Sequence, residues 1–327
     1  MSTPIRWGIL GTGSIARKFA DGLAVLDDAD LVAVGSRSQD TADAFADGYA
    51  IPSRHATYEA LAGDSEVDAI YVATPHALHR ENSILCLEAG KAVLCEKPFT
   101  INRGEAEEVV AVARERKVFL MEAMWTRFLP IMTQVRAWVS EGAVGDIRVV
   151  SADFGFGSRV NPDSRLYKPE LGGGALLDVG VYSVSFASMI LGGSPSRIAG
   201  MAHIGEIPVD EQAGMVLGYE SGAIAVLYTS ICARTPQHAY ILGSEGSIHI
   251  HSPFWQGTTA TLSRGGKEKT VELPFEGNGY NCEAAEVMRC LREGRTESET
   301  MPLDETLSVM GTLDEIRAQW GLKYPME

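Results

Sequence analysis

The hydrophobic residues of this chain follow one pattern in its first half and another in its second half. In the first half, short stretches that are apolar at nearly every position alternate with longer stretches whose apolar residues recur every three or four positions. The short stretches are typical of strands buried on both faces, and the longer ones are typical of helices. This alternation, continued over about 120 residues, predicts a doubly wound parallel sheet. We expect its strands at residues 5–10, 31–35, 68–73, 92–95 and 118–121.

In the second half, from residue 144 onward, strands follow one another through short turns rather than through helices. Alternation at 147–154 predicts a strand, and a glycine-rich stretch at 172–174 opens a largely apolar helix that reaches residue 191. A mostly antiparallel sheet with one open face is expected next. Its paired strands are expected at 213–219 with 223–229, 239–242 with 247–251 and 258–263 with 270–273, and closing helices at 281–293 and 303–320.

The open face of the second sheet needs a cover, because a large exposed apolar face is unfavourable in water. A second copy of the same chain is the simplest cover, since a two-fold dimer buries the same patch on both partners. We therefore expect a homodimer that forms through this open face.

Composition narrows the possible partners of this 327-residue chain. The formal net charge of −15 argues against binding to nucleic acid and to anionic membrane surfaces. No apolar run approaches the roughly 18 residues of a membrane span, and the first strand begins too early to leave room for a signal peptide. Five cysteines without a Cys-x-x-Cys pair indicate reduced thiols, and no set of residues has the spacing of metal ligands. We expect a cytoplasmic protein that binds a small-molecule substrate and no metal.

A glycine-rich turn follows the first expected strand. Residues 11–16 read Gly-Thr-Gly-Ser-Ile-Ala, which matches the G-x-G-x-x-A dinucleotide fingerprint, and a helical pattern follows at once. Gly11 permits the tight turn, Gly13 lets a pyrophosphate approach the backbone, and Ala16 keeps the helix close to the sheet. The free N–H groups at the helix start are expected to bind the phosphates. The expected cofactor contacts in this turn are Gly11, Thr12, Gly13, Ser14 and Ile15.

The second strand ends in Ser36-Arg37-Ser38. An acidic residue at this place usually binds the ribose of NAD, whereas an arginine accommodates the 2′-phosphate of NADP. The two serines add hydroxyl donors. We therefore predict NADP as the cofactor, with a solvated surface arginine as the alternative. The predicted fold class is α/β, with a Rossmann-type domain at 1–122 and an α+β substrate-binding and dimerisation domain at 123–327.

Two further strands end in side chains suited to a ligand, because open α/β sheets bind ligands at the carboxyl ends of their strands. Thr74 and Pro75 follow one strand, and His79 comes next, where it either contacts the nicotinamide ribose or caps a helix. The strand at 92–95 ends in Glu96-Lys97-Pro98, and the proline cannot continue a central strand. Lys97 is therefore expected to point toward the ligand.

Asp178 and Tyr182 lie four residues apart in the glycine-opened helix, so they project from one helical face. The residues around them are apolar, and the helix is therefore expected to be largely buried. A buried aspartate near a buried tyrosine is unfavourable unless both have partners. This pair favours a functional site over a solvated face.

These features together resemble the Gfo/Idh/MocA oxidoreductase family, over essentially the whole chain. The resemblance is greatest to the branch of dimeric dihydrodiol dehydrogenases and NADP-dependent D-xylose dehydrogenases. It rests on the glycine turn, Ser36-Arg37-Ser38, and the stretches at 90–98, 119–128 and 173–182. Many family members carry a histidine four residues after the aspartate, whereas this chain has Tyr182, as that branch does.

The resemblance implies hydride transfer between NADP and a carbonyl or secondary alcohol, in a cleft between the two domains. Lys97 is then expected beside nicotinamide and substrate, and Tyr182 is expected to act as the acid/base. A free tyrosine has a pKa of about 10, so a phenolate near neutral pH requires roughly 3 units of depression, or about 4 kcal/mol. Lys97 and the nicotinamide cation both favour the phenolate. Either residue could transfer the proton, and Asp178 is expected to bind a substrate hydroxyl or to position Lys97.

Aromatic side chains suit either an arene dihydrodiol or the apolar face of a sugar. Arg127, Arg159 and Arg165 are candidates for polar substrate contacts, and Glu96 either contacts the nicotinamide ribose or neutralises a neighbour. The expected substrate contacts are Trp125, Phe154, Trp255 and Tyr280. The expected cofactor contacts outside the glycine turn are Ser36, Arg37, Ser38, Thr74, Pro75, His79, Glu96, Lys97, Trp125 and Arg127.

The expected substrates are trans-dihydrodiols or aldoses such as D-xylose. Two alternatives remain: an NADPH-dependent reductase of ketoses of the 1,5-anhydrofructose type, and a non-catalytic NADP-sensing regulator. The presence of Lys97, Asp178 and Tyr182 together argues against a regulator, which has no need of them. NADPH formation with a panel of aldoses and dihydrodiols would distinguish an enzyme from a sensor.

Overall fold

The computed structural model describes residues 3–327, which divide into two compact units. The first unit contains the chain up to Trp125 together with Glu276–Thr306, and the second contains Thr126–Phe275 and Leu307–Glu327. The predicted boundary after residue 122 lies close to Trp125. Glu276–Thr306 belongs to the first unit, whereas the sequence-based prediction assigned it to the second domain. Hydrophobic periodicity identifies a helix here but does not say which sheet the helix covers.

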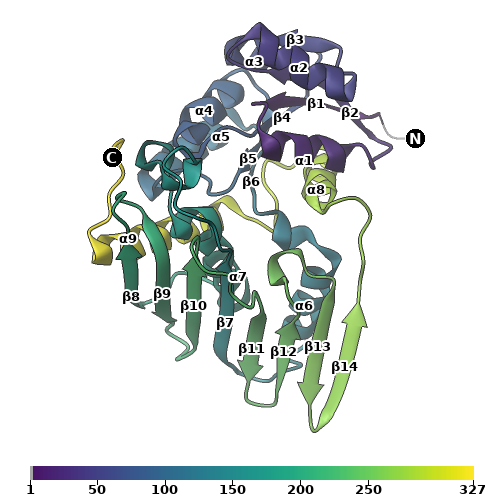
Figure 1. The fold of residues 1–327 in the computed structure, drawn as a ribbon. Helices are drawn as coiled ribbons and strands as arrows, with labels where there is room; N and C mark the ends of the chain where they lie inside the picture. Colours follow the sequence, from purple (N-terminus) through teal and green to yellow (C-terminus); the bar gives the residue numbers. More distant parts are fainter. Residues whose placement is uncertain (1–2) are drawn as a thin grey trace. The chain divides into compact units, whose positions relative to one another are not determined.

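The first unit is built on a six-stranded sheet with the order β3-β2-β1-β4-β5-β6, and every recorded pairing in it is parallel (Figure 1). The predicted doubly wound parallel sheet is confirmed. The short strand β3 was missed, because three half-buried residues carry too little pattern. The strands are β1 (Ile5–Leu10), β2 (Ala29–Gly35), β3 (Ser53–His55), β4 (Ala69–Val72), β5 (Ala92–Glu96) and β6 (Leu120–Ala123).

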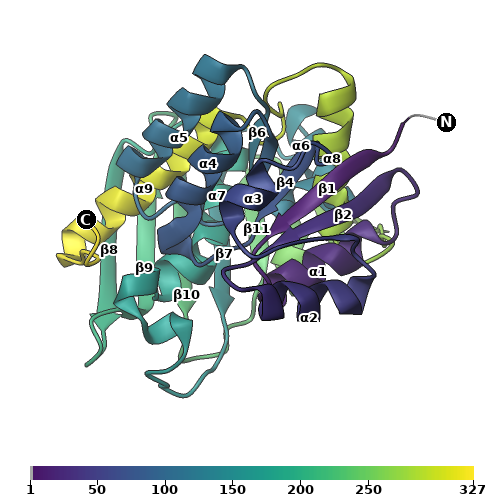
Figure 2. The same ribbon diagram turned by 90° about the horizontal axis from the view of Figure 1, so that it is seen from above.

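The helices of the first unit pack on this sheet and on one another. Helix α8 packs against α1, and Gly22 of α1 makes room for it: a Cβ at Gly22 would lie 3.0 Å from Asn281 N and 3.1 Å from Tyr280 Cβ. Helices α4 and α5 also pack together (Figure 2). The helices are α1 (Ser14–Leu23), α2 (Gln39–Tyr49), α3 (Tyr58–Ala62), α4 (His79–Glu88), α5 (Arg103–Arg116) and α8 (Tyr280–Arg292), with a short 3-10 helix at His76–Leu78.

The second unit is built on an eight-stranded sheet with the order β14-β13-β12-β11-β7-β10-β9-β8 (Figure 1). Within this sheet, only β7 and β10 pair in parallel among the described strands, so the prediction of a mostly antiparallel sheet is confirmed. Strand β8, which the sequence analysis did not identify, forms one edge. The strands are β7 (Ile147–Gly155), β8 (Arg197–Ile204), β9 (Asp210–Gly218), β10 (Ile224–Ser230), β11 (Ala239–Gly243), β12 (Gly246–Ile250), β13 (Thr259–Arg264) and β14 (Lys267–Glu272).

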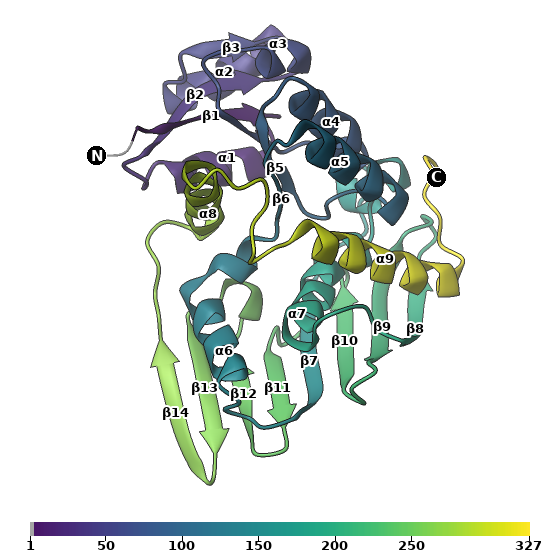
Figure 3. The same cartoon turned by 180° about the vertical axis from the view of Figure 1, so that it is seen from behind.

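Helices cover one face of this sheet and leave the other open (Figure 3). Exposed residues alternate with half-buried ones along β8 and with buried ones along much of β9 and β10, as expected for a sheet with one solvated face. The covering helices are α6 (Pro130–Ser140), α7 (Val181–Leu191) and the second-unit part of α9 (Leu303–Trp320). Short helical turns lie at Trp125–Phe128, Arg165–Tyr167, Pro169–Leu171 and Phe254–Gln256, and a π-helical turn at Leu176–Gly180 leads into α7.

One helical segment has the length and composition of a membrane span, contrary to the sequence-based expectation. Pro169–Leu191 reaches a mean hydropathy of 1.6 over 18 residues, but 89% of that window is buried inside the protein. A core helix has the same composition, because it is surrounded by apolar neighbours on all sides.

Candidate active site

The glycine turn of the first unit forms an open cradle at the start of α1. The Gly11 N–H donates to Gly35 O at 2.9 Å, and φ at Gly11 is +108°, in the region that favours glycine. A Cβ at Gly11 would lie 2.9 Å from Ala73 O, whereas a Cβ at Gly13 would meet nothing within 4 Å. Gly13 caps α1 without a side-chain hydrogen bond, and Ala16 is fully buried. This geometry fits a pyrophosphate bound to the first N–H groups of α1, so the fingerprint lies in the structural context it requires.

At the end of β2, the three residues predicted to bind a 2′-phosphate differ in their surroundings. The Ser36 and Ser38 hydroxyls hydrogen-bond the Thr41 hydroxyl at 2.5 and 2.8 Å, and Ser38 also accepts from Thr41 N as the cap of α2. Arg37 lies between them and is exposed. The serines thus have structural roles as well, and Arg37 is the residue best suited to a phosphate.

His79 connects the ends of β4 and β5. Its side chain is fully buried, with its two ring nitrogens 2.8 Å from Thr74 O and Pro98 O. Burial lowers the pKa of His79 to about 4, so the imidazole is neutral at pH 7 and donates to only one of the two carbonyls. Asn82 donates to the Thr74 hydroxyl at 3.3 Å. His79 therefore positions two strand ends, and this burial speaks against the expected contact with the nicotinamide ribose.

Lys97 follows directly from β5, and Glu96, the last residue of that strand, interacts with another buried carboxyl group. Glu96 is buried, accepts a hydrogen bond from the Tyr71 hydroxyl, and accepts the Lys97 N–H at 3.0 Å. Glu283 of α8 is fully buried, and neither of its carboxyl oxygens has a hydrogen-bond partner among the described residues. Burial and, next, the charge of Glu96 raise the pKa of Glu283 well above its usual range. Sequence reasoning missed this cluster because Glu283 and Glu96 lie far apart in the chain.

Two of the four aromatic residues predicted to bind substrate stack within the first unit. The rings of Trp125 and Tyr280 lie 4.9 Å apart between centroids at an interplanar angle of 19°. Both side chains are buried.

The other two aromatic residues stack within the second unit, beside Tyr182. The rings of Phe154 and Trp255 are 4.7 Å apart between centroids and nearly parallel, at 4°. The Tyr182 ring lies 5.3 Å from Phe154 and 6.4 Å from Trp255. The Thr126 hydroxyl donates to Trp255 O at 2.8 Å and helps to hold the helical turn Phe254–Gln256 that contains Trp255. The unit therefore places the candidate acid/base beside an aromatic platform.

Asp178 lies in the π-helical turn Leu176–Gly180, directly before Tyr182 and α7. Single π-turns are uncommon and are frequent at functional sites. The Asp178 carboxylate is buried, and Arg165 Nη2 lies 2.5 Å from its Oδ1. Arg165, a candidate for a polar substrate contact, is therefore paired with Asp178 of the predicted site. The sequence did not predict this ion pair, because Arg165 and Asp178 lie 13 residues apart in different structural elements.

Arg127 is almost fully buried, and its guanidinium donates to Ser185 Oγ at 3.0 Å and to Ser185 O at 2.8 Å. These bonds attach the segment after Trp125 to α7. The cofactor contact expected for Arg127 therefore gains no support from its position.

Within residues 3–327, no three His, Cys, Asp or Glu side chains are grouped so that they could hold a metal ion. Cys86, Cys95 and Cys290 are buried, and Cys232 and Cys282 are half-buried; all five are unpaired.

The first unit thus has the turn, the strand ends and the lysine of a nicotinamide-dependent oxidoreductase, and the second has an aspartate and a tyrosine on one helix beside an aromatic platform. Comparison with family models agrees with this class. Residues 5–124 match the oxidoreductase family with an NAD-binding Rossmann fold, and residues 132–249 match the GFO/IDH/MocA C-terminal domain. The chain belongs to the Gfo/Idh/MocA family of oxidoreductases and is an enzyme that acts on CH–OH groups with a nicotinamide cofactor.

Individual relatives share the whole length of the chain. The trans-1,2-dihydrobenzene-1,2-diol dehydrogenase of Xenopus tropicalis is 38% identical over 331 residues, covering 98% of this chain and 99% of the relative. The human enzyme of that name is 37% identical over 334 residues, covering 99% of each chain.

Solved structures share the fold at lower identity. A 3-ketoreductase from Actinomadura kijaniata, in complex with NADP and TDP-benzene, has a TM-score of 0.85 and 29% identity, covering 97% of this chain and 98% of the other. An aldose-aldose oxidoreductase from Caulobacter crescentus, complexed with glycerol, has a TM-score of 0.89 and 25% identity with the same coverage.

Proposed function

We propose that this enzyme transfers hydride between NADP and a secondary alcohol or hemiacetal, with trans-dihydrodiols and aldoses such as D-xylose as its substrates. The observation that carries the proposal is the placement of Tyr182 beside the Phe154–Trp255 stack. An aromatic platform suits both a cyclic diene diol and a pyranose ring. The full-length similarity to trans-dihydrodiol dehydrogenases supports the diol in particular.

NADP is preferred over NAD in this proposal because Arg37 is exposed at the end of β2, where a 2′-phosphate needs a cation. The bound structure of the Actinomadura 3-ketoreductase contains NADP and supports the same choice. When bound, the oxidised nicotinamide supplies the hydride acceptor.

The chain's own residues handle the proton. Oxidation of an alcohol releases a proton along with the hydride, and in this proposal Tyr182 receives it as general base. Lys97 stabilises negative charge that develops on the substrate oxygen. Asp178, held by Arg165, accepts a hydrogen bond from a second substrate hydroxyl. In the reverse direction, Tyr182 returns the proton to the alcohol oxygen.

A second candidate function is the NADPH-dependent reduction of ketoses of the 1,5-anhydrofructose type. The observation that favours it is the similarity to a 3-ketoreductase over nearly the whole chain. Both candidates use the same side chains, and the direction of hydride transfer distinguishes them.

Initial rates with a panel of substrates test these candidates. We expect NADPH formation with a trans-dihydrodiol and with D-xylose, and slower NADH formation when NAD replaces NADP. Faster NADPH consumption with 1,5-anhydrofructose than NADPH formation with any alcohol would favour the reductase instead. Turnover with NAD but not with NADP would contradict the cofactor assignment.

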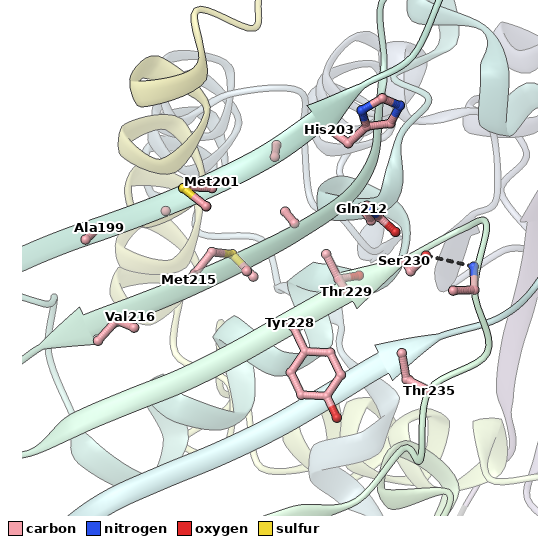
Figure 4. Close-up of a pocket in the computed structure, with 15 residues that line it drawn as sticks. Ala199, Met201, His203, Gln212, Met215, Val216, Tyr228, Thr229, Ser230 and Thr235 are labelled. Atoms are coloured by element: carbon pink, nitrogen blue, oxygen red, sulfur yellow. Dashed lines mark hydrogen bonds between the residues drawn. The ribbon is translucent and has the colours of Figure 1, made fainter.

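The open face of the second sheet is proposed to bind a second copy of this chain. Its outward side chains include Met201, Val216 and Tyr228, from β8, β9 and β10, and Met201 is 81% exposed (Figure 4). They line a hollow of about 700 Å³ that contains no Asp, Glu, Lys or Arg, although the chain has a net charge of −15. A largely apolar hollow without formal charges suits a self-complementary partner.

Light scattering tests the dimer. We expect a dimer for the wild type and a monomer for Met201→Glu, which would place two like charges in the interface. Val25→Glu, which adds a charge on an exposed valine of the first unit, is the matched control. A monomeric wild type at micromolar concentration would contradict the dimer. The cytoplasm remains the proposed location, because five unpaired cysteines suit a reducing compartment.

A further inference from the structure

Asp210 lies at the start of β9, on the side of the strand that faces the helical segment with Asp178 and Tyr182. Its side chain is fully buried, and the Leu176 N–H donates to its Oδ2 at 2.6 Å. Leu176 begins the π-helical turn, so its N–H is one of the donors that a helix leaves unsatisfied at its first turn. A carboxylate at this place also interacts favourably with the helix dipole.

The backbone before this turn is shaped around Asp210. Gly174 has φ of +119°, and a Cβ at this position would overlap Asp210 Oδ1. Two neutral groups hold the same stretch: the Tyr324 hydroxyl donates to Gly173 O at 2.7 Å, and the Thr229 hydroxyl lies 3.4 Å from Ala175 O. Asp210 is thus the acidic member of a set of side chains that hold residues 173–176.

The fixed helix start has a consequence for Asp178 and Tyr182, because both follow Leu176 within two turns. The hydrogen bond from Asp178 N to Gly174 O, which joins the turn to the residues before it, is long, at 3.4 Å, so this bond adds little support to the helix start. A displacement there would be passed along the helix to both side chains. Displacements of about 1 Å in a reacting group can lower turnover by about 100-fold.

We propose that Asp210 is a positioning residue: its carboxylate anchors the start of the helical segment that carries Asp178 and Tyr182 and thereby sets the orientation of both side chains. The catalytic part of this statement rests on the proposed function. The anchoring part concerns the folded chain alone and can be measured without substrate.

The surroundings of Asp210 give the proposal a pH dependence. Burial raises the pKa of Asp210 to about 7, against the opposing effects of main-chain N–H donors and Arg317. The charged and titratable groups that interact with it are Arg317 and Tyr324. Tyr324 in turn interacts with Asp178, and Arg317 is itself paired with Glu327 and Asp314. Below pH 7 the carboxyl is protonated and becomes a weaker acceptor for Leu176, so the anchor loosens as the pH falls.

The test compares Asp210→Ala and Asp210→Asn with a matched control, Asp153→Asn. Asp153 is also buried on the same sheet, but it accepts hydrogen bonds from Gln237 N at 2.6 Å and His238 N at 3.3 Å rather than from the helix. Two quantities are measured: hydrogen–deuterium exchange of the peptide spanning 174–182, and kcat and KM for the alcohol between pH 5.5 and 9.

For Asp210→Ala we expect about tenfold faster exchange in that peptide and a kcat about 30-fold lower, with KM changed less than threefold. Asp210→Asn keeps an oxygen acceptor, so its kcat should lie within about fivefold of the wild type and lack the fall near pH 7. Asp153→Asn should change neither quantity.

Wild-type exchange and kcat in a folded Asp210→Ala would overturn the proposal. If that variant does not fold, Asp210→Asn decides: a pH profile identical to the wild type in both exchange and kcat overturns the anchor. Absence of turnover in the wild type with every alcohol would refute the proposed function, while the exchange data would still test the anchor.

Discussion

The two units hold their candidate catalytic groups by different means. In the first unit, Lys97 extends directly from β5, and the main chain of the sheet decides where it lies. In the second unit, Tyr182 stands on a helix whose start is held by side chains from β9 and β10. A group placed by a strand end can be recognised in the local sequence. A group placed by packing depends on partners from elsewhere in the chain, which local sequence does not reveal.

The substitution with the largest expected effect tests whether Tyr182 of the second unit or Lys97 of the first unit transfers the proton. We expect Tyr182→Phe to lower kcat about 1,000-fold, because general acid–base catalysis contributes a factor of this order. In alcohol oxidation the base must be deprotonated, so the acidic limb of the pH–rate profile, where activity falls as the pH drops below the pKa of the base, should disappear with it. Lys97→Met should lower kcat while the limb remains.

Tyr219→Phe serves as the control, because Tyr219 is a buried tyrosine of the same unit, at the turn after β9. The opposite pattern, with the limb lost in Lys97→Met and kept in Tyr182→Phe, would place the proton transfer in the first unit.

The next largest effect tests whether Arg37, at the end of β2 in the first unit, binds the 2′-phosphate of NADP. Arg37→Gln should weaken NADP binding about 10- to 100-fold, because hydrogen bonds to a charged group contribute about 1.5–3 kcal/mol. NAD binding should change little, since NAD lacks the 2′-phosphate. Fluorescence titration of both nucleotides gives the ratio. Arg103→Gln, an exposed arginine paired with Glu107 on α5, is the control. An unchanged ratio would show that another group reads the phosphate.

A smaller effect tests the buried pair of carboxyl groups formed by Glu96 and Glu283 in the first unit. The pKa of Glu283 is raised in the folded state, so its contribution to stability is present at low pH and is lost as the pH rises above the unfolded value of 4.5. We therefore expect Glu283→Gln to match the wild type at pH 4 and to be more stable by on the order of 2 kcal/mol at pH 7.

Urea unfolding at both pH values measures this difference. Glu107→Gln, at an exposed position on α5, should show no comparable pH dependence. Equal stabilities of Glu283→Gln and the wild type at both pH values would mean that the buried carboxyl gains a compensating partner.

The substitution with the smallest expected effect tests whether Ser38, after the end of β2, serves as a helix cap or as a ligand of the 2′-phosphate. Ser38→Ala removes the cap of α2 and should lower the free energy of unfolding by about 1 kcal/mol. The preference for NADP should persist, because Arg37 remains. Thermal unfolding and nucleotide titration of the same preparation check both statements. A loss of NADP preference without a loss of stability would assign Ser38 to the phosphate instead.

Much of the fold could be predicted from the sequence, because most of the parallel strands are largely apolar runs and the predicted hairpins of the second sheet have turns rich in glycine and polar residues. The glycine turn was predictable for the same reason: Gly11 and Gly13 have a conformation or a clearance that glycine provides. The short strand β3 carried too few residues to form a pattern.

The buried acidic residues Glu283 and Asp210 could not be predicted as parts of the site, because their partners come close only after folding. Glu283 meets Glu96 through the packing of α8 in the first unit, and Asp210 meets Leu176 through the pairing of β9 with its neighbours. In the sequence, Asp210 is one acidic residue before a strand. For His79, the sequence left open a contact with the nicotinamide ribose or a helix cap, and the structure shows a buried ring with main-chain carbonyls beside both nitrogens.

The close fit of α8 against Gly22 of α1 also bears on the order in which this protein can mature. The ribosome makes α1 early and α8 only after the 150 residues of Thr126–Phe275 have emerged. Domains of growing chains generally fold from the N-terminus onward. Here, however, the nucleotide-binding unit stays incomplete until nearly the whole protein has been translated. A fragment ending at Trp125 would leave one side of α1 bare, and we expect it to aggregate unless Glu276–Thr306 is joined to it.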